Sequence, residues 1–234
     1  MTFSIVIPAY NEEAMIGRAI ESLRRQKFPR KNYEIIVVDG DSTDDTIAVA
    51  RRAGADRVVI EKKKGTNIAR NRGYLMARGE YVAFLDSDSE APADWLSRIE
   101  KHFTSSPDVA AVSGPYDYGF TGFQKITESW YTRWLLPRVP ELLHFLFRKK
   151  AGVMLGGNFT VRRSVLKEIG GLPPISFWGD DATLAMIISR RSGNVVFDPD
   201  LRVKSSPRRF ERDGFLPLAF HYARAYLGAY FTVE

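Results

Sequence analysis

Within residues 3–85, short apolar runs alternate with amphipathic stretches. The runs are rich in β-branched and aromatic side chains, which is typical of buried strands, and they lie at residues 3–7, 34–38, 57–60 and 81–85. The stretches between them carry apolar side chains at helical spacing, and they lie at residues 12–26, 43–53 and 66–78. The pattern therefore predicts alternating strands and helices.

Strands with nearly continuous apolar side chains are typical of a parallel sheet that helices cover on both faces. Right-handed crossovers make the predicted fold α/β, with a Rossmann-like, doubly wound sheet. Such a sheet binds ligands beyond the carboxyl ends of its strands. The residues that directly follow each predicted strand are therefore the first candidates for a functional site.

Carboxylates follow three of the four predicted strands, and a basic run follows the other one. The segments are Pro8–Glu12, Asp39–Asp41, Lys62–Gly65 and Asp86–Asp88. Carboxylates suit a divalent cation, and lysines attract a phosphate-bearing ligand unless the run is simply a solvated face. On an extended segment, Asp86 and Asp88 share one side and can bind the same ion.

The composition limits which metal ligands and which classes of bound molecule we expect. The 234 residues include no cysteine and three scattered histidines, so we expect carboxylates to bind any metal. The net charge of +6 favours a phosphate-rich ligand, nucleic acid or an anionic membrane surface. No GxGxxG follows the first strand and no GxxxxGK[ST] occurs, which argues against NAD enzymes and P-loop NTPases. We therefore expect Mg²⁺ or Mn²⁺ between carboxylates and a diphosphate.

Six motifs carry a family resemblance. They are IVIPAYNEE at 5–13, IIVVDGDSTDDT at 35–46, GTNIARNRG at 65–73, GEYVAFLDSD at 79–88, LGGNFTVRR at 155–163 and WGDDATL at 178–184. In this order and spacing they resemble glycosyltransferase family 2, whose members use nucleotide sugars and have the GT-A fold, with a mixed sheet and helices on both faces. The match spans residues 3–205.

The resemblance implies a division of the chain. A GT-A catalytic domain would occupy residues 1–205, with a nucleotide-sugar-binding half at 1–115 and an acceptor-side half at 116–205. Residues 206–234 would form an amphipathic, membrane-proximal extension.

The donor site is implied in the first half. The residues expected to contact the nucleotide sugar are Pro8, Tyr10, Glu12, Asp39, Asp41, Lys64, Arg70, Asp86 and Ser87. Asp39 would accept a hydrogen bond from the base, or alternatively form a turn. Arg70 would contact the base or a phosphate, or alternatively pair with a surface carboxylate. Asp88 is implied as the direct metal ligand, with Asp86 on the nucleotide side of the ion.

The catalytic base is implied in the second half. Family members often carry Glu-Asp where this chain has Asp180-Asp181, so Asp181 takes the role of base and Asp180 lies beside it. The pair also begins a predicted helix, so its alternative role is to cap that helix. For a phosphate acceptor, which is already ionised, Asp181 would mainly position groups. The residues implied on the acceptor side are Gly157, Asn158, Trp178, Arg208 and Arg209, the two arginines on a loop.

Two segments point to a membrane surface. Residues 123–150 mix aromatic with basic side chains, and residues 214–234 are apolar and aromatic at helical spacing. Charged residues interrupt both, so we expect peripheral contact rather than a membrane span. The alternative for 123–150 is packing on the sheet around the acceptor site. Because the N-terminus lacks a signal-peptide pattern, we expect a cytoplasmic location, at the cytosolic membrane face.

The resulting functional prediction is an inverting glycosyltransferase. The donor would be a nucleoside-diphosphate sugar, with UDP favoured and GDP possible. The acceptor group would be a hydroxyl or a phosphate. It would belong to a polyprenyl or other lipid-linked acceptor, or to a cell-envelope glycan. No nucleic-acid partner is expected. A nucleotidyltransferase with a similar sheet and a non-enzymatic basic membrane-binding module are the alternatives.

Overall fold

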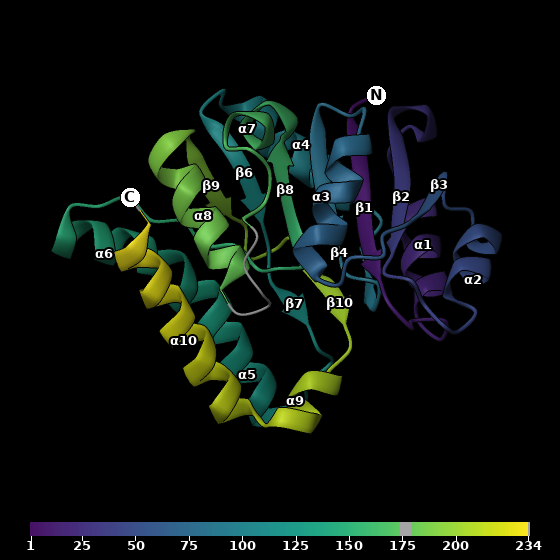
Figure 1. Cartoon of the computed structure of the whole chain (residues 1–234). Helices are drawn as coiled ribbons and strands as arrows, with labels where there is room; N and C mark the ends of the chain where they lie inside the picture. Colours follow the sequence, from purple (N-terminus) through teal and green to yellow (C-terminus); the bar gives the residue numbers. More distant parts are fainter. Residues whose placement is uncertain (174–178, 234) are drawn as a thin grey trace.

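A computed structural model describes residues 1–173 and 179–233, and its helices and strands follow one another as Figure 1 shows. The strands are β1 (Phe3–Ala9), β2 (Tyr33–Asp39), β3 (Arg57–Ile60), β4 (Tyr81–Leu85), β5 (Ser89–Glu90), β6 (Val109–Ser113), β7 (Tyr116–Asp117), β8 (Asn158–Arg162), β9 (Asn194–Phe197) and β10 (Val203–Ser205). The α-helices are α1 (Ile16–Arg24), α2 (Thr46–Ala53), α3 (Thr66–Met76), α4 (Trp95–Ser105), α5 (Gly122–Trp130), α6 (Val139–Phe147), α7 (Arg163–Glu168), α8 (Asp180–Arg191), α9 (Arg208–Asp213) and α10 (Phe215–Thr232). Short helical turns lie at η1 (Arg30–Asn32), η2 (Tyr131–Leu135) and η3 (Leu136–Arg138).

Seven strands form one mixed sheet in the order β3-β2-β1-β4-β8-β6-β9. Strands β1 to β4 are parallel to their neighbours in this group, whereas β8 runs antiparallel to both β4 and β6. A second sheet, β5-β10-β7, lies beyond the carboxyl ends of β1 and β4 (Figure 1). The predicted doubly wound α/β fold with a mixed sheet is confirmed.

The side chains of β1 alternate between two hydrophobic cores. Ile5 and Ile7 pack with side chains of α1 and α4 on one face, whereas Val6 packs with side chains of α3 and α8 on the other. Successive side chains of a strand point to opposite faces, so a strand that is apolar at every position requires helices on both. This is the arrangement that the uninterrupted apolar runs predicted.

The boundaries differ from the predictions around the first loop. Strand β1 continues past Pro8 to Ala9, which the sheet tolerates because β4 pairs with β1 only as far as Val6. Helix α1 begins at Ile16 rather than residue 12 and α2 at Thr46 rather than residue 43. The residues before both helices instead form loops that hydrogen-bond to each other.

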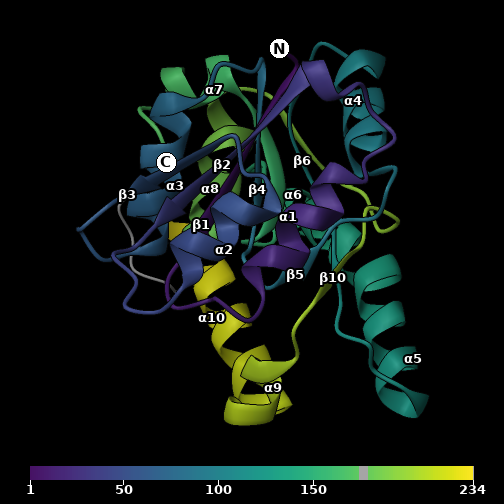
Figure 2. The ribbon, with the colours of Figure 1, turned by 90° about the vertical axis from the view of Figure 1, so that its right-hand side faces the viewer.

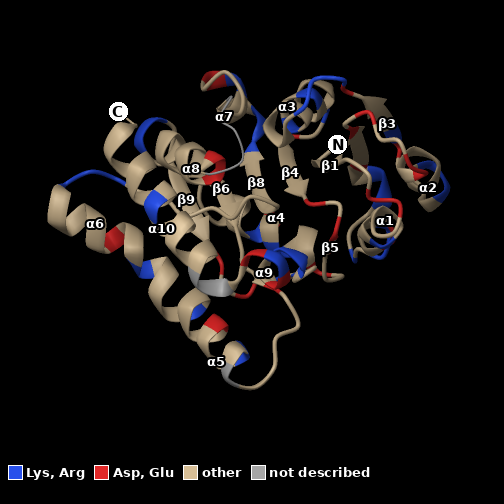
Figure 3. Cartoon of the chain, turned by 60° about the horizontal axis from the view of Figure 1, so that its bottom comes forward, with Lys and Arg blue, Asp and Glu red and all other residues tan. Residues whose placement is uncertain are grey.

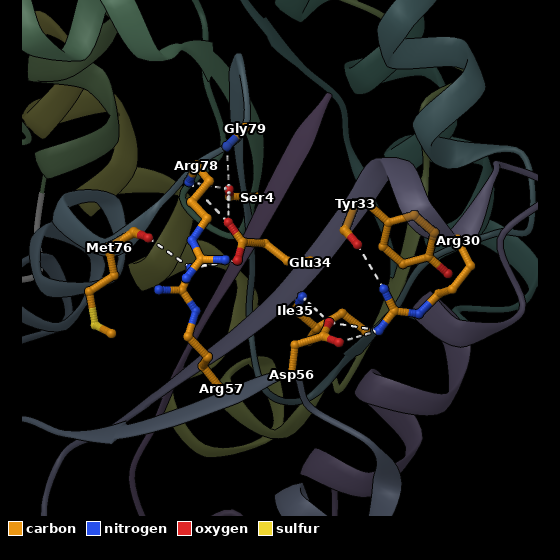
Figure 4. A network of polar contacts seen from close by, with 10 residues as sticks. All are labelled: Ser4, Arg30, Tyr33, Glu34, Ile35, Asp56, Arg57, Met76, Arg78 and Gly79. Carbon is orange, nitrogen blue, oxygen red and sulfur yellow. Dashed lines mark hydrogen bonds and ion pairs between the residues drawn. The ribbon is translucent and has the colours of Figure 1, made fainter. Parts of the chain in front are cut away.

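A buried polar network joins the amino-terminal ends of the first three strands (Figure 4). The Glu34 carboxylate of β2 accepts hydrogen bonds from Ser4 Oγ at 2.6 Å and Arg78 N at 2.9 Å, and it pairs with Arg57 of β3. Burial opposes the charged form, but these donors lower the pKa of Glu34 below its usual value. The network fixes this end of the sheet and leaves the carboxyl ends for ligands.

The C-terminal helix α10 is packed into the fold. Its Tyr230 and Ala229 are buried in one cluster with Ala182 and Met186 of α8 and Leu143 of α6. The segment predicted as an extension from residue 206 therefore packs against the rest of the chain through one side of α10, and the division into domain and extension stays a prediction. Within residues 1–173 and 179–233, the structure contains no helix that is both long and apolar enough to cross a bilayer.

Candidate functional site

The loops after β1 and β2 are held together by reciprocal hydrogen bonds. The backbone N–H groups of Asn11 and Glu12 donate to Ser42 Oγ at 2.9 Å and Thr46 Oγ1 at 2.8 Å, and Thr43 N donates back to Asn11 Oδ1 at 2.9 Å. These backbone N–H groups lie before the first residues of α1 and α2, so they have no backbone partner within a helix, and the bonds between the loops satisfy them instead. The result is a fixed rim at the carboxyl ends of β1 and β2.

Tyr10 and Lys64 come together on this rim. The Lys64 Nζ atom lies 4.0 Å from the centre of the Tyr10 ring and donates a hydrogen bond to Gly40 O at 2.7 Å. The Tyr10 ring is half exposed, so one aromatic face and a cation are available to a planar, anionic ligand. Both residues were predicted to contact the nucleotide.

Asp39 forms a turn in the structure. It is fully buried, and its Oδ1 and Oδ2 atoms accept hydrogen bonds from Ser42 N at 2.8 Å and Ser42 Oγ at 2.7 Å. This is the alternative role given to Asp39 above, and each oxygen retains a second lone pair. Asp41 lies exposed next to it with a positive φ of 63°, while the side chain of Ser87 is buried.

Arg70 of α3 lies buried between two carboxylates. Its Nη2 donates to Asp86 Oδ1 at 3.0 Å and its Nη1 donates to Asp180 Oδ2 at 3.1 Å. The same guanidinium reaches Asn67 Oδ1 and the carbonyl oxygen of Gly156. The residue is 4% exposed. Protein acceptors therefore surround its terminal nitrogens, and the contact of Arg70 with the base or a phosphate stays a prediction.

Arg208 bridges Glu12, in the loop after β1, and Asp88, the second aspartate of the Asp86-Ser87-Asp88 (DSD) motif. It lies at the start of α9, a helix where a loop was predicted, and its Nη2 contacts Glu12 Oε1 at 2.9 Å and Asp88 Oδ2 at 3.1 Å. Burial, together with the nearby Asp86 charge, raises the pKa of Asp88. Burial also raises the pKa of Glu12. Two carboxylates that disfavour ionisation thus share one exposed guanidinium.

The surroundings of the Asp181 carboxyl group differ from those of Asp180. Burial and the adjacent Asp180 carboxylate raise the pKa of Asp181 to about 6. Its Oδ1 accepts a hydrogen bond from Ala182 N at 2.7 Å, and its Oδ2 lies beside Gly156. The N-cap residue Gly179 has a φ of 86°, which turns the chain sharply into α8. A carboxylate near this pKa suits a general base.

The residues predicted on the acceptor side fall into different environments. Asn158 is fully buried: its Oδ1 accepts a hydrogen bond from Trp95 Nε1, and its Nδ2 donates to Pro115 O and Leu201 O. These contacts are structural, and its role on the acceptor side stays a prediction. A Cβ on Gly157 would lie 2.0 Å from Asp86, so only glycine fits there. Arg209 donates to Tyr222 Oη of α10 at 3.0 Å. Trp178 lies outside the described residues.

The sequence analysis missed Tyr116. Its hydroxyl donates to Asp86 Oδ2 at 3.1 Å, opposite the side that Arg70 occupies. The available signal was position, because Tyr116 follows the buried strand β6 much as the other site residues follow theirs. Tyr116 lies after the four predicted strands and outside the six motifs, so neither signal pointed to it.

The two aspartates of the DSD motif fit a divalent cation. In the described part of the chain, no group of three or more histidine, aspartate or glutamate side chains is arranged to hold a metal. Mg²⁺ and similar ions are commonly held by one or two carboxylates together with substrate phosphates. Asp86 and Asp88 supply that donor set, provided that Arg208 releases Asp88.

Comparisons with known proteins identify the family of the chain. A family model described as Glycosyl transferase family 2 matches residues 4–170. Glycosyltransferase AglE of Haloferax volcanii is 27% identical over 183 residues, which are 76% of this chain and 58% of that protein. GalNAc(5)-diNAcBac-PP-undecaprenol beta-1,3-glucosyltransferase of Campylobacter jejuni is 36% identical over 102 residues, 41% of this chain and 32% of that protein.

A solved structure extends the comparison to the fold. The mannosyltransferase PcManGT of Pyrobaculum calidifontis, in complex with GDP-Man and Mn²⁺, superposes with a TM-score of 0.70 at 23% identity, over 98% of this chain and 63% of that one. At this identity the similarity concerns the fold. The chain spans 58% and 32% of the lengths of the two sequence relatives from Haloferax and Campylobacter.

Proposed function

The chain belongs to glycosyl transferase family 2, and we propose that it is an inverting, metal-dependent glycosyltransferase. The donor is a nucleoside-diphosphate sugar, with UDP favoured over GDP. The observation that carries the proposal is the link through Arg70, whose guanidinium contacts Asp86 at 3.0 Å and Asp180 at 3.1 Å. A donor-side carboxylate and the start of the base-bearing helix therefore meet at one guanidinium.

The nucleotide binds at the rim formed by the first two loops. Tyr10 offers an exposed ring, and Lys64 lies 4.0 Å from the centre of that ring as a partner for the diphosphate. The buried Asp39 retains lone pairs for a ring N–H of the base. Asp86 and Asp88 would hold a divalent cation, which would offset the charge that builds on the departing diphosphate.

Asp181 acts on the acceptor. Its carboxylate takes the proton of an acceptor hydroxyl, and the resulting oxygen attacks the anomeric carbon from the side opposite the diphosphate. The new carbon–oxygen bond forms as the bond to the diphosphate breaks, so the configuration inverts. A phosphate acceptor is already ionised, and Asp181 then orients it.

We propose a lipid-linked acceptor and peripheral membrane contact at the cytosolic face. Most of the large apolar side chains that are exposed in the described part of the chain lie on α5 to α6 and on α10, including Trp130, Trp134, Phe145, Phe220 and Phe231. The basic residues Arg148 to Lys150 follow α6 directly, and they form the blue segment after that helix in Figure 3. Aromatic and basic side chains together favour the interface of an anionic bilayer. The name of the Campylobacter relative, which includes undecaprenol, supports the same acceptor class.

Calorimetric titration with UDP and GDP, each with and without Mn²⁺, tests the donor site. We expect one nucleotide to bind the wild-type protein at least tenfold more tightly with Mn²⁺, and Asp88→Asn to lose this gain. Asp108→Asn is the matched control, because Asp108 is exposed before β6, away from the site. Binding of neither nucleotide would refute the donor site, and release of pyrophosphate from a nucleoside triphosphate would favour the nucleotidyltransferase alternative.

A further inference from the structure

We propose that Arg70 is a positioning residue, which fixes the donor-side carboxylate Asp86 and the base-bearing helix α8 relative to each other. This inference rests on the proposed function, because it assigns Asp86 to the donor and Asp181 to the acceptor. It goes beyond that function by naming the residue that sets the distance between the two halves of the site.

The contacts of Arg70 come from four separate segments. Its Nη1 donates to Asn67 Oδ1 of α3 at 3.3 Å and to Asp180 Oδ2 of α8 at 3.1 Å. Its Nη2 donates to Asp86 Oδ1, after β4, at 3.0 Å and to the carbonyl oxygen of Gly156, before β8. A planar guanidinium with fixed donor directions can hold all four acceptors in one arrangement.

The terminal nitrogens of Arg70 are engaged by protein acceptors. Both terminal nitrogens point at protein acceptors, and the Nε atom is buried with no hydrogen-bond partner in the described part of the chain. The guanidinium carbon also lies 5.6 Å from the centre of the Phe159 ring. The side chain is 5% exposed, whereas that of Arg208, at the rim of the same site, is 54% exposed. Arg208 is thus the better placed of the two to meet a diphosphate.

The contacts of Arg70 also flank the base. Asp180 directly precedes Asp181, and a Cβ on Gly156 would lie 3.5 Å from Asp181 Oδ2. Arg70 therefore holds two of the neighbours that define where the Asp181 carboxylate lies. Since small displacements of a reacting group are costly to rate, loss of this contact set should affect turnover more than nucleotide affinity.

The test compares Arg70→Lys with Arg72→Lys, which changes an exposed residue of the same helix. Lysine keeps the charge but cannot span Asp86 and Asp180 at once. With UDP-glucose and GDP-mannose as donors, we expect kcat for donor hydrolysis to fall about 10- to 100-fold in Arg70→Lys. The Kd for the nucleotide and Mn²⁺ should stay within about threefold of wild type, and Arg72→Lys should match wild type in both. A rise in Kd that accounts for the whole loss, or an unchanged kcat, would overturn the proposal.

A second measurement does not depend on activity. Thermal unfolding of Arg70→Lys, Asp180→Asn and the double variant forms a double-mutant cycle. We expect the Tm loss of the double variant to be clearly smaller than the two single losses combined, because either change alone breaks the same contact. Additive losses would contradict the proposed link. Failure of the glycosyltransferase assignment is seen separately, as the absence of nucleotide binding and donor hydrolysis in the wild-type protein.

Discussion

Two adjacent aspartates of α8 have different chemistry because they have different neighbours. Asp180 lies 3.1 Å from the Arg70 guanidinium, so its carboxylate forms an ion pair within the fold. Burial and the Asp180 charge raise the pKa of Asp181 to about 6, and its Oδ1 accepts a hydrogen bond from its neighbour Ala182 N. The same residue type therefore supplies an ion-pair partner at one position and a candidate base at the next.

The raised pKa of Asp181 predicts a pH limit on turnover. Below about pH 6 the carboxyl group is protonated and cannot accept the acceptor's proton, so kcat/KM should fall tenfold per pH unit on the acid side. Asp181→Asn should lower kcat by about 10²- to 10⁴-fold and leave nucleotide binding intact. An acid limb near pH 4 in the wild-type profile would contradict this assignment.

The same shift predicts a gain in stability when Asp181 is replaced. A pKa that is higher in the folded state than the usual 3.8 means that the stability this group contributes is complete below about pH 4 and is lost as the pH rises through about 6. Asp181→Asn should therefore raise the free energy of unfolding by about 1–3 kcal/mol at pH 7.5 and by little at pH 4. Urea unfolding at both pH values checks the sign.

At the scale of elements, α10 supports α8, the helix that carries the proposed base. Tyr230 of α10 is fully buried, and its hydroxyl donates to Leu143 O at 3.1 Å, while Arg190 of α8 donates to Tyr230 O at 2.8 Å. At the other end of α8, a Cβ on Gly179 would lie 3.2 Å from Ala225. The two helices therefore contact each other from the N-cap of α8 to its last turn.

Truncation of Tyr230 should loosen this contact. We expect Tyr230→Phe to cost about 1 kcal/mol of unfolding free energy, for the lost hydrogen bonds, and Tyr230→Ala to cost about 3–5 kcal/mol, for the cavity. Phe220→Ala, which changes a mostly exposed ring of the same helix, should stay within about 0.5 kcal/mol of wild type. Equal losses for Phe220→Ala and Tyr230→Ala in chemical unfolding would show that α10 is not docked as described.

At the scale of the whole molecule, the apolar surface is concentrated on one part of the fold. Helices α5, α6 and α10 carry most of the exposed aromatic side chains, and α5 and α9 lie beyond the edge where β1 and β4 end (Figures 1 and 2). The α5 part of the surface that we propose for lipid contact therefore lies on the same side of the molecule as the candidate site, whereas α6 lies to the side, near the C-terminal half of α10 (Figure 1). A lipid-linked acceptor would reach the site without leaving the membrane.

Vesicle sedimentation tests this surface. We expect the wild-type protein to bind vesicles of phosphatidylglycerol and phosphatidylcholine, and to bind less as NaCl is raised from 50 to 500 mM, roughly the range in which salt screens such contacts. The double variant Trp130→Ser/Trp134→Ser should lose most of this binding. Ile60→Ser, at an exposed apolar residue of β3, is the control and should bind as wild type. Equal binding of all three proteins would exclude the proposed surface.

The sequence by itself determined the elements and the chemistry at their ends. Hydrophobic runs located β1 to β4 to within about two residues, because burial on both faces makes every position of a strand apolar. The same local order placed Tyr10, Asp39, Asp86 and Asp88 at the carboxyl edge of the sheet, since a parallel sheet brings these ends together. The order of the six motifs extended the predicted site to Asp181.

Only the tertiary structure decided which of these residues meet. Arg70 is 110 positions from Asp180, and Arg208 is 196 positions from Glu12, so no local pattern encodes either contact. The docking of α10 and the burial of Asn158 likewise depend on distant partners. Periodicity and motifs describe neighbours along the chain, whereas ion pairs, burial and pKa shifts depend on neighbours in space, which exist only once the sheet has formed.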